Sequence, residues 1–194
     1  MAGLSSFEEL EREIEKTRSE FYAEAGGKNT FFKKQQKYDC AKQVVSKISL
    51  DVLLERTCYI LKDTNCVHID YPFMKSYASP DIFDIIADYI IAQFQKVKDE
   101  FGELLVCLNF DGFTVSAAER YKVLIDVFCQ KCFQRNTGFA PVVTQFVVYN
   151  ATNVVDAIKH IVWPFMEENV RATLLVVHKK DSGPYNARFY PEPA

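Results

Sequence analysis

The chain has 194 residues with 23 basic and 26 acidic side chains, and this length is sufficient to bury a full hydrophobic core. The net charge of −3 excludes a global field that would attract nucleic acid or an anionic membrane, so any such contact must be local. The sequence shows no signal-peptide pattern near its start and no apolar run of about 20 residues. We therefore expect a soluble, cytoplasmic protein with reduced cysteines and no nucleic-acid partner.

Residues 1–50 are expected to form an N-terminal helical extension. Within them, 6–24 are rich in charge and carry apolar side chains at helical spacing, and Gly26 and Gly27 follow. The segment 28–49 interleaves aromatic side chains with lysines. We favour a helix that packs its rings on the domain and keeps its lysines in water, over a segment that docks on acidic headgroups or RNA. The candidates for peripheral membrane contact are Lys33, Lys34 and Lys37.

Residues 51–180 are expected to form one α/β core, and 181–194 a C-terminal tail. In this core, strand-like runs rich in β-branched residues alternate with long segments of helical periodicity. The predicted elements are a hairpin over 57–77, helices over 79–101, 114–134 and 153–168, and strands over 104–110, 144–150 and 172–179. We expect Ser79 to cap the helix over 79–101, with Pro80 in its first turn. The alternation predicts a mostly parallel central sheet flanked by helices.

No pattern typical of a catalytic site is present, and we expect a protein that is not an enzyme, with no catalytic residue, cofactor or metal. Glycine-rich phosphate loops, nucleophile elbows and zinc-protease motifs are all lacking. Cys129 and Cys132 form a CxxC near the end of the helix over 114–134, not at the start of a helix after a strand. This position favours core packing over a metal or redox role.

The helix predicted over 153–168 contains a proline, in the pair Trp163-Pro164. Proline has no backbone N–H and its ring clashes with the carbonyl four residues earlier, here that of His160. Two interpretations follow: the proline makes the helix easier to move, or it bends a core helix around the sheet.

The order of these elements resembles that of the CRAL-TRIO family of lipid-transfer proteins. The segment "NFDGFT" places Asn109, Gly112 and Thr114 at positions of a family motif, and "NAT" at 150–152 is similar to the family's Asn-Ala-Pro motif. Pro164-Phe165 matches a Pro-Phe pair of the following helix. The resemblance covers residues 55–178.

The resemblance implies that the helix over 153–168 is a gate above a hydrophobic lipid pocket. Phosphoinositide-binding members carry an acidic residue and a lysine at positions that fall near Pro141 and Ala172 here, so this kind of headgroup recognition is not implied. The chain is therefore similar to a divergent or trimmed member of the family.

Two functional hypotheses follow. The first is a non-enzymatic binding module that holds a lipid or another apolar ligand between the sheet and the gate-like helix over 153–168. The second is a protein-interaction scaffold of the same fold, in which the 16 Phe and 10 Tyr residues of the chain help to fill the pocket and the partner is a protein. Pocket walls are lined mostly by apolar and aromatic groups. The candidate ligand-binding residues are Phe110, Phe128, Val148, Ile158, Trp163 and Phe165.

Overall fold

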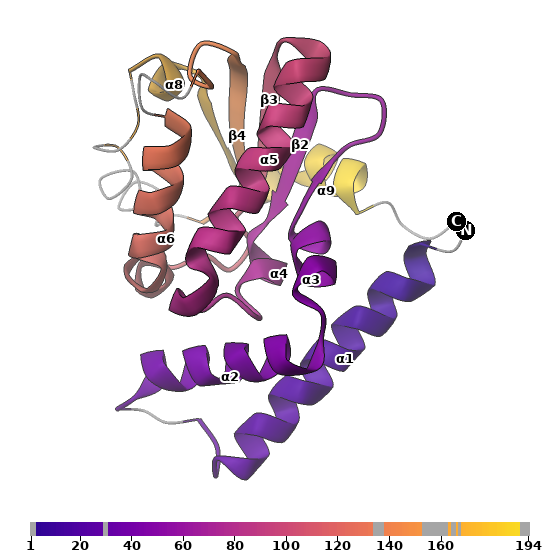
Figure 1. Ribbon diagram of the computed structural model, residues 1–194, viewed down its shortest axis with the longest axis vertical. Helices are drawn as coiled ribbons and strands as arrows, with labels where there is room; N and C mark the ends of the chain where they lie inside the picture. The colour runs from indigo at the N-terminus through magenta and orange to yellow at the C-terminus, as the bar shows by residue number, and fades with distance from the viewer. Residues whose placement is uncertain are drawn as a thin grey trace.

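The computed structural model describes residues 3–28, 31–133, 138–152, 163, 166 and 168–190. Its first two helices, α1 (Gly3–Glu24) and α2 (Lys33–Lys47), pack against each other at one end of the molecule (Figure 1). Tyr38 of α2 is buried, and its hydroxyl donates a hydrogen bond of 2.6 Å to the Arg120 carbonyl. This side chain fixes α2 to the rest of the chain.

The five described strands form one sheet in the order β1-β2-β3-β4-β5. A short helix, α3 (Leu50–Thr57), leads into the hairpin of β1 (Cys58–Ile60) and β2 (Cys66–Asp70), which are antiparallel. The remaining strands, β3 (Leu104–Asn109), β4 (Val143–Ala151) and β5 (Leu174–His178), pair in parallel. This arrangement confirms the predicted α/β class with its mostly parallel sheet.

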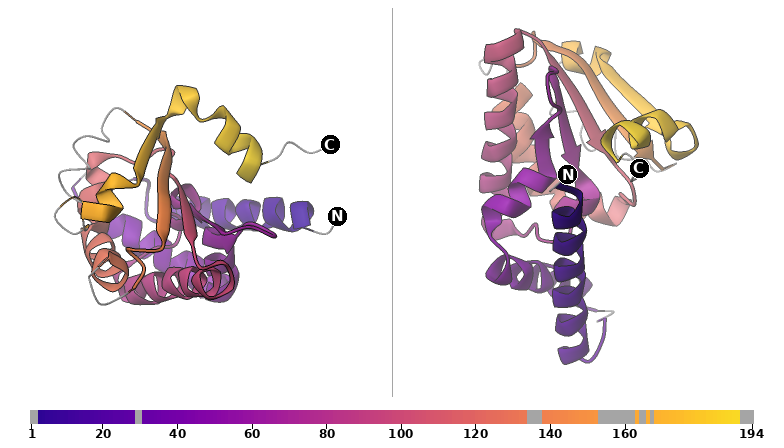
Figure 2. Two further views of the ribbon diagram at one scale, coloured as in Figure 1. Left: turned by 90° about the horizontal axis from the view of Figure 1, so that it is seen from above. Right: turned by 90° about the vertical axis from the view of Figure 1, so that its right-hand side faces the viewer.

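Two long helices, α5 (Phe83–Phe101) and α6 (Val115–Phe133), pack against each other and cover one face of the sheet (Figure 2). Helix α5 follows the short helix α4 (Tyr71–Met74) and the 3-10 turn η1 (Pro80–Ile82). The predicted hairpin therefore extended too far, because its strand ends at Asp70, whose side chain caps α4. Ser79 lies at the N-cap of η1, which leads into α5, with Pro80 in the first turn as predicted, but its side chain makes no capping hydrogen bond. The Ile82 N–H donates instead to the Ser79 carbonyl at 3.1 Å, which closes a 3-10 turn.

The opposite face of the sheet is covered by α9 (Gly183–Phe189), which lies across the sheet from α5 and α6 (Figure 2). Between β5 and α9 comes the 3-10 turn η3 (Lys179–Asp181), and α8 (Glu168–Ala172) precedes β5. Residues 183–189, which we placed in a C-terminal tail, thus form a helix with a buried Phe189.

The helix predicted over 153–168 falls largely outside the described residues, as does the Pro164-Phe165 pair. Of that segment, Trp163, Met166 and Glu168 are described. None of the helices in the described ranges is long and apolar enough to cross a membrane.

Candidate functional site

A cavity of about 160 Å³ lies between the sheet and helices α5 and α6. Its wall consists of aliphatic and aromatic side chains with two sulfur-containing types, Met and Cys, and none of the described lining residues carries a charge. The wall has three parts: a floor from the strands, a roof from the helices, and an aromatic end at the carboxyl side of the strands.

The floor is a row of side chains across four neighbouring strands. Ile69 of β2 pairs with Leu108 of β3, which pairs with Val148 of β4, which pairs with Val176 of β5. Because side chains alternate along a strand, residues in register on adjacent strands point to the same face. The four apolar side chains therefore form one continuous surface under the cavity.

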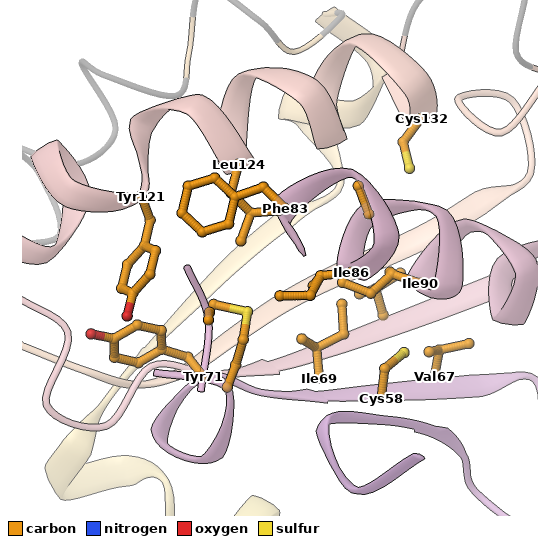
Figure 3. Packing of buried hydrophobic residues seen from close by; sticks show 14 of the residues in the cluster. Cys58, Val67, Ile69, Tyr71, Phe83, Ile86, Ile90, Tyr121, Leu124 and Cys132 are labelled. Carbon is orange, nitrogen blue, oxygen red and sulfur yellow. The ribbon is translucent and has the colours of Figure 1, made fainter. Parts of the chain in front are cut away.

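The roof comes mainly from one stripe of α6. Tyr121, Leu124, Ile125 and Phe128 line the cavity and lie three, four and seven residues apart, a spacing that puts them on one side of a helix. Figure 3 shows Tyr121 and Leu124 reaching from α6 toward the sheet. This stripe faces the floor, and the side chains of the stripe and the floor do not completely fill the space between α6 and the sheet.

The aromatic end is formed by Tyr71, Phe110 and Phe113. The rings of Phe110 and Phe113 are stacked with centroids 4.1 Å apart, and Tyr71 meets Phe113 edge to face at 4.7 Å. Burial raises the pKa of Tyr71 to about 12, so its hydroxyl is neutral at physiological pH. The rings close this end of the cavity without adding a charge.

The structure places Phe110, Phe128, Val148 and Trp163, all named from the sequence, in the cavity wall. Ile158 and Phe165 lie outside the described residues. The side chain of Trp163 is 37% exposed, and the Arg171 guanidinium lies 5.7 Å from its ring centroid. Whether these residues bind a ligand stays a prediction.

Sequence reasoning did not select Tyr121, Leu124 and Ile125, although their helical spacing was visible. An apolar stripe on a helix predicts burial, and it does not tell a cavity wall from a filled core. What distinguishes these three residues from those of a filled core is the cavity between them and the floor.

Cys129 and Cys132 lie in the hydrophobic core, as the packing interpretation predicts. Burial raises the pKa of the Cys129 thiol to about 12, so the reactive thiolate form is scarce at neutral pH. Among the described residues, no group of three His, Cys, Asp or Glu side chains is placed to hold a metal ion.

A polar cluster occupies the carboxyl ends of the strands, beyond the aromatic end of the cavity. Asp70 accepts hydrogen bonds from Arg56 at 3.0 Å and from the Tyr190 hydroxyl at 2.5 Å. Asn109 donates to the Tyr190 hydroxyl at 2.9 Å and accepts from Asn150 at 3.0 Å. These bonds tie the ends of β2, β3 and β4 to the residue that follows α9.

The same cluster borders a cleft of about 530 Å³ between α1 and the sheet. The charged groups of this cleft pair with one another, in the ion pairs Arg56–Asp70, Arg56–Glu11, Arg18–Glu15 and Lys179–Asp111. A charged ligand that bound in this cleft would have to replace one of these ion pairs, so the cleft is not suited to charged ligands.

One comparison with known proteins, that with solved structures, supports the fold. No family model matches the sequence, and no curated protein matches it. Among solved structures, the chain is similar to Sfh5, a member of the Sec14/CRAL-TRIO family, with a TM-score of 0.55 at 14% identity. The chain has a CRAL-TRIO-like fold. The match covers 76% of this chain and 56% of Sfh5, so the chain corresponds to about half the length of that protein.

Two of the three motifs that carried the CRAL-TRIO resemblance meet at the carboxyl ends of β3 and β4, and the third, Pro164-Phe165, lies outside the described residues. Asn109 and Asn150 bond to each other across β3 and β4, as described above. Gly112 and Asn150 both have positive φ angles, of 67° and 53°. The Thr114 hydroxyl accepts from the Ala117 N–H at 3.2 Å at the start of α6. These four motif residues thus have structural roles at the ends of β3 and β4 and at the start of α6.

Proposed function

We propose that the chain is a non-enzymatic binding module whose cavity holds a lipid or another apolar ligand between the sheet and the segment 153–168. The observation that carries this proposal is the uncharged cavity on the sheet, in a fold similar to that of a Sec14/CRAL-TRIO protein. Burying apolar surface contributes about 25 cal/mol per Å², so a wall without charges favours an apolar occupant.

The volume of the cavity limits what it holds without rearrangement. Pockets for small molecules usually measure about 300–1,000 Å³, whereas this cavity measures about 160 Å³. An apolar cavity of about 150 Å³ in another protein stays dry and binds benzene. A single ring or a short stretch of acyl chain therefore fits the cavity, and a whole lipid requires wall side chains to move outward. Trp163 and Phe128 are suited to this, because neither is fully buried.

The second candidate is a protein-interaction scaffold of the same fold. It is favoured by the same small volume, because aromatic side chains such as Phe110, Phe113 and Tyr121 already occupy much of the space between sheet and helices. In this case the cavity is a packing defect, and the partner is a protein that binds elsewhere on the surface.

A filling substitution tests the binding module. Val148→Phe adds a ring to the cavity floor, whereas Val123→Phe adds the same ring on α6 where the side chain is 62% exposed. We expect purified wild type to take up pyrene-labelled phosphatidylcholine from neutral vesicles, read by native mass spectrometry and by pyrene emission. Val148→Phe should reduce this uptake at least about tenfold, and Val123→Phe should leave it unchanged.

Two results would favour the scaffold. One is a wild-type protein that takes up neither pyrene-labelled phosphatidylcholine nor a small apolar probe such as benzene. The other is equal uptake by both phenylalanine variants, which would place the bound probe outside the cavity.

A further inference from the structure

A second, basic pocket lies where the beginning of α2 meets the first turns of α6. It measures about 410 Å³, and its wall includes four cationic side chains, Lys33, Lys34, Lys37 and Arg120. Glu119 is the one acidic residue among the described lining residues. The pocket is separate from the apolar cavity, but both use α6, since the consecutive residues Arg120 and Tyr121 line one each.

The cations of this basic pocket differ from those of the polar cleft because they are not neutralised. Within the described ranges, Lys33, Lys34, Lys37 and Arg120 make no ion pair, whereas each cation of the polar cleft has an acidic partner. The Arg120 Nε is buried and finds no hydrogen-bond acceptor in the described part of the chain. A guanidinium with an unused donor is suited to an oxyanion ligand.

The positive charge around the basic pocket affects the pKa of Lys37. Burial lowers the pKa of Lys37, and the neighbouring positive charges of Arg120, Lys33, Lys28 and Arg18 lower it further. A bound anion would relieve this repulsion, because an opposite charge within a few ångströms favours the protonated amine. The local field here is positive although the chain as a whole carries a net charge of −3.

Two aromatic side chains project from the surface beside the basic pocket. Phe31 is 93% exposed and Phe32 is 72% exposed, immediately before the first turn of α2. The end of α1 and the beginning of α2 lie at the lower end of the molecule in Figure 1. Large apolar side chains rimmed by lysines mark interaction sites, and aromatic rings favour the interface of a bilayer.

We propose that this face docks on an anionic lipid bilayer, with a lipid phosphate in the basic pocket and Phe31 and Phe32 in the headgroup region. The proposal extends the expected membrane contact of Lys33, Lys34 and Lys37 to a defined phosphate site that includes Arg120. It goes beyond the apolar cavity and would hold even if that cavity bound no ligand. A membrane fits better than RNA because two adjacent exposed rings offer apolar contact area, which a bilayer interface accepts without base stacking.

The test is flotation of the full chain with phosphatidylcholine vesicles that contain or lack phosphatidic acid. Each cation near an anionic surface contributes about 1 kcal/mol, or about fivefold in binding. Lys37→Gln/Arg120→Gln should therefore bind acidic vesicles about 20-fold more weakly than wild type. The matched control, Lys62→Gln/Lys96→Gln, makes the same charge change outside the basic pocket and should lose at most a few-fold.

A second variant keeps the proposal falsifiable if the first one folds poorly. Lys33→Gln/Lys34→Gln alters lysines on the first turn of α2, and it should also bind acidic vesicles about 20-fold more weakly. Phe31→Ser/Phe32→Ser should keep binding at low salt and lose the part that survives high salt, because salt screens only the charges. Native mass spectrometry of the same variants should show cavity ligands at wild-type levels, which separates this proposal from the proposed function.

Three outcomes would overturn the docking site: equal binding to neutral and acidic vesicles, wild-type binding by the Lys37→Gln/Arg120→Gln protein, or equal losses in this protein and its matched control. In a fourth outcome, the wild type does not bind vesicles but binds single-stranded RNA, and Lys37→Gln/Arg120→Gln abolishes the RNA binding. That result would assign the basic pocket to nucleic-acid phosphates.

Discussion

The two faces of the sheet are packed in different ways. Under α5 and α6, Leu108 and Val148 face a cavity whose described lining residues carry no charge. On the other face, His68 stacks on Phe189 with ring centroids 4.2 Å apart, and its Nε2 lies 2.7 Å from the Tyr149 hydroxyl. Stacked rings and hydrogen bonds have a preferred geometry, whereas dispersion contacts between aliphatic groups are individually weak.

The face of the sheet that contains His68 is therefore held in one side-chain arrangement. The polar cluster at the strand ends is held in the same way, because a buried polar group that loses its partner destabilises the fold strongly. On the face that contains the cavity, the side chains have space to move. A ligand that enters there displaces aliphatic side chains such as Leu108 and Val148 without breaking a hydrogen bond.

The largest effect is expected where the polar cluster is broken at its centre. Asp70→Ala removes the partner of Arg56, whose side chain is only 10% exposed, and also the acceptor of the Phe73 N–H at the start of α4. Removing one partner of a buried ion pair costs about 3–5 kcal/mol. Urea denaturation should show a loss of this size in the free energy of unfolding.

The matched control for Asp70 is Asp111→Ala. Asp111 forms an ion pair of 2.6 Å with Lys179, but both side chains are largely exposed, at 44% and 65%. Such pairs contribute less than about 1 kcal/mol. Equal losses for the two alanine variants would contradict the view that the buried cluster holds this end of the sheet.

The next effect concerns pH and the buried imidazole of His68. Burial, together with the positive charge of Arg56, lowers the pKa of His68 to about 3. The unfolded imidazole binds a proton near pH 6.5, so between about pH 6.5 and pH 3 the unfolded chain holds more protons than the folded one. The contribution of His68 to stability is thus complete above about pH 6.5 and declines as pH falls.

The decline should reach about 1.4 kcal/mol per pH unit from this one group, or about 2–3 kcal/mol between pH 6.5 and pH 4.5. His68→Gln keeps a hydrogen-bonding side chain and removes the titration, so its unfolding free energy should vary less over this range. Parallel pH profiles of wild type and His68→Gln, measured by urea denaturation, would show that His68 is charged in the folded protein.

A smaller effect compares the two faces at neighbouring positions of one strand. Val147 and Val148 are both buried in β4 and point to opposite faces. Val148→Phe enters the cavity and should change stability by less than about 1 kcal/mol, because the space is already present. Val147→Phe enters a face filled by aromatic rings and should cost about 1–3 kcal/mol.

Thermal denaturation of the two phenylalanine variants decides this comparison. Equal losses at the two positions would mean that the cavity closes in solution, and a larger loss at Val148 would reverse the assignment of the packed face. Since both variants replace valine by phenylalanine in the same strand, the change in β-propensity is the same in both and does not affect the comparison.

Local sequence patterns predicted the strands and the parallel sheet, but not the contacts between residues that are far apart in the sequence. The apolar runs containing Leu108 and Val148 predicted buried strands, and in the structure these strands pair with the two residues in register. The polar cluster could not be predicted, because Asp70 meets a side chain 120 residues later in the chain, Tyr190. The segment of α9 has little helical periodicity of its own, and its helix is supported by the packing of Phe189 on His68.

The cavity was accessible to prediction only in part. Phe110 and Phe128 were chosen because they are large and apolar, and both lie in the cavity wall. A volume of about 160 Å³ depends on side-chain rotamers and on the distance between α6 and the sheet, which no sequence pattern contains. The basic pocket shows the same limit, because Arg120 joins Lys37 through tertiary packing.

The smallest effect tests why asparagine occupies position 150, next to the last residue of β4. Asn150 has a φ of 53°, a conformation that costs residues with a Cβ about 1–2 kcal/mol and costs glycine almost nothing. Asn150→Ala and Asn150→Gly both lose the bonds to Asn109 and Asn186. We therefore expect the alanine variant to be less stable than the glycine variant by about 1 kcal/mol in urea denaturation.

Asp63 provides the matched control, because it has a φ of 56° in the exposed turn between β1 and β2. The same difference of about 1 kcal/mol between alanine and glycine is expected at Asp63, with a smaller total loss because no buried network is broken. Equal stability of Asn150→Ala and Asn150→Gly would show that this backbone conformation is not what selects asparagine. If Asn150→Gly also takes up pyrene-labelled phosphatidylcholine like wild type, the asparagine of the "NAT" motif serves the strand end and not the ligand.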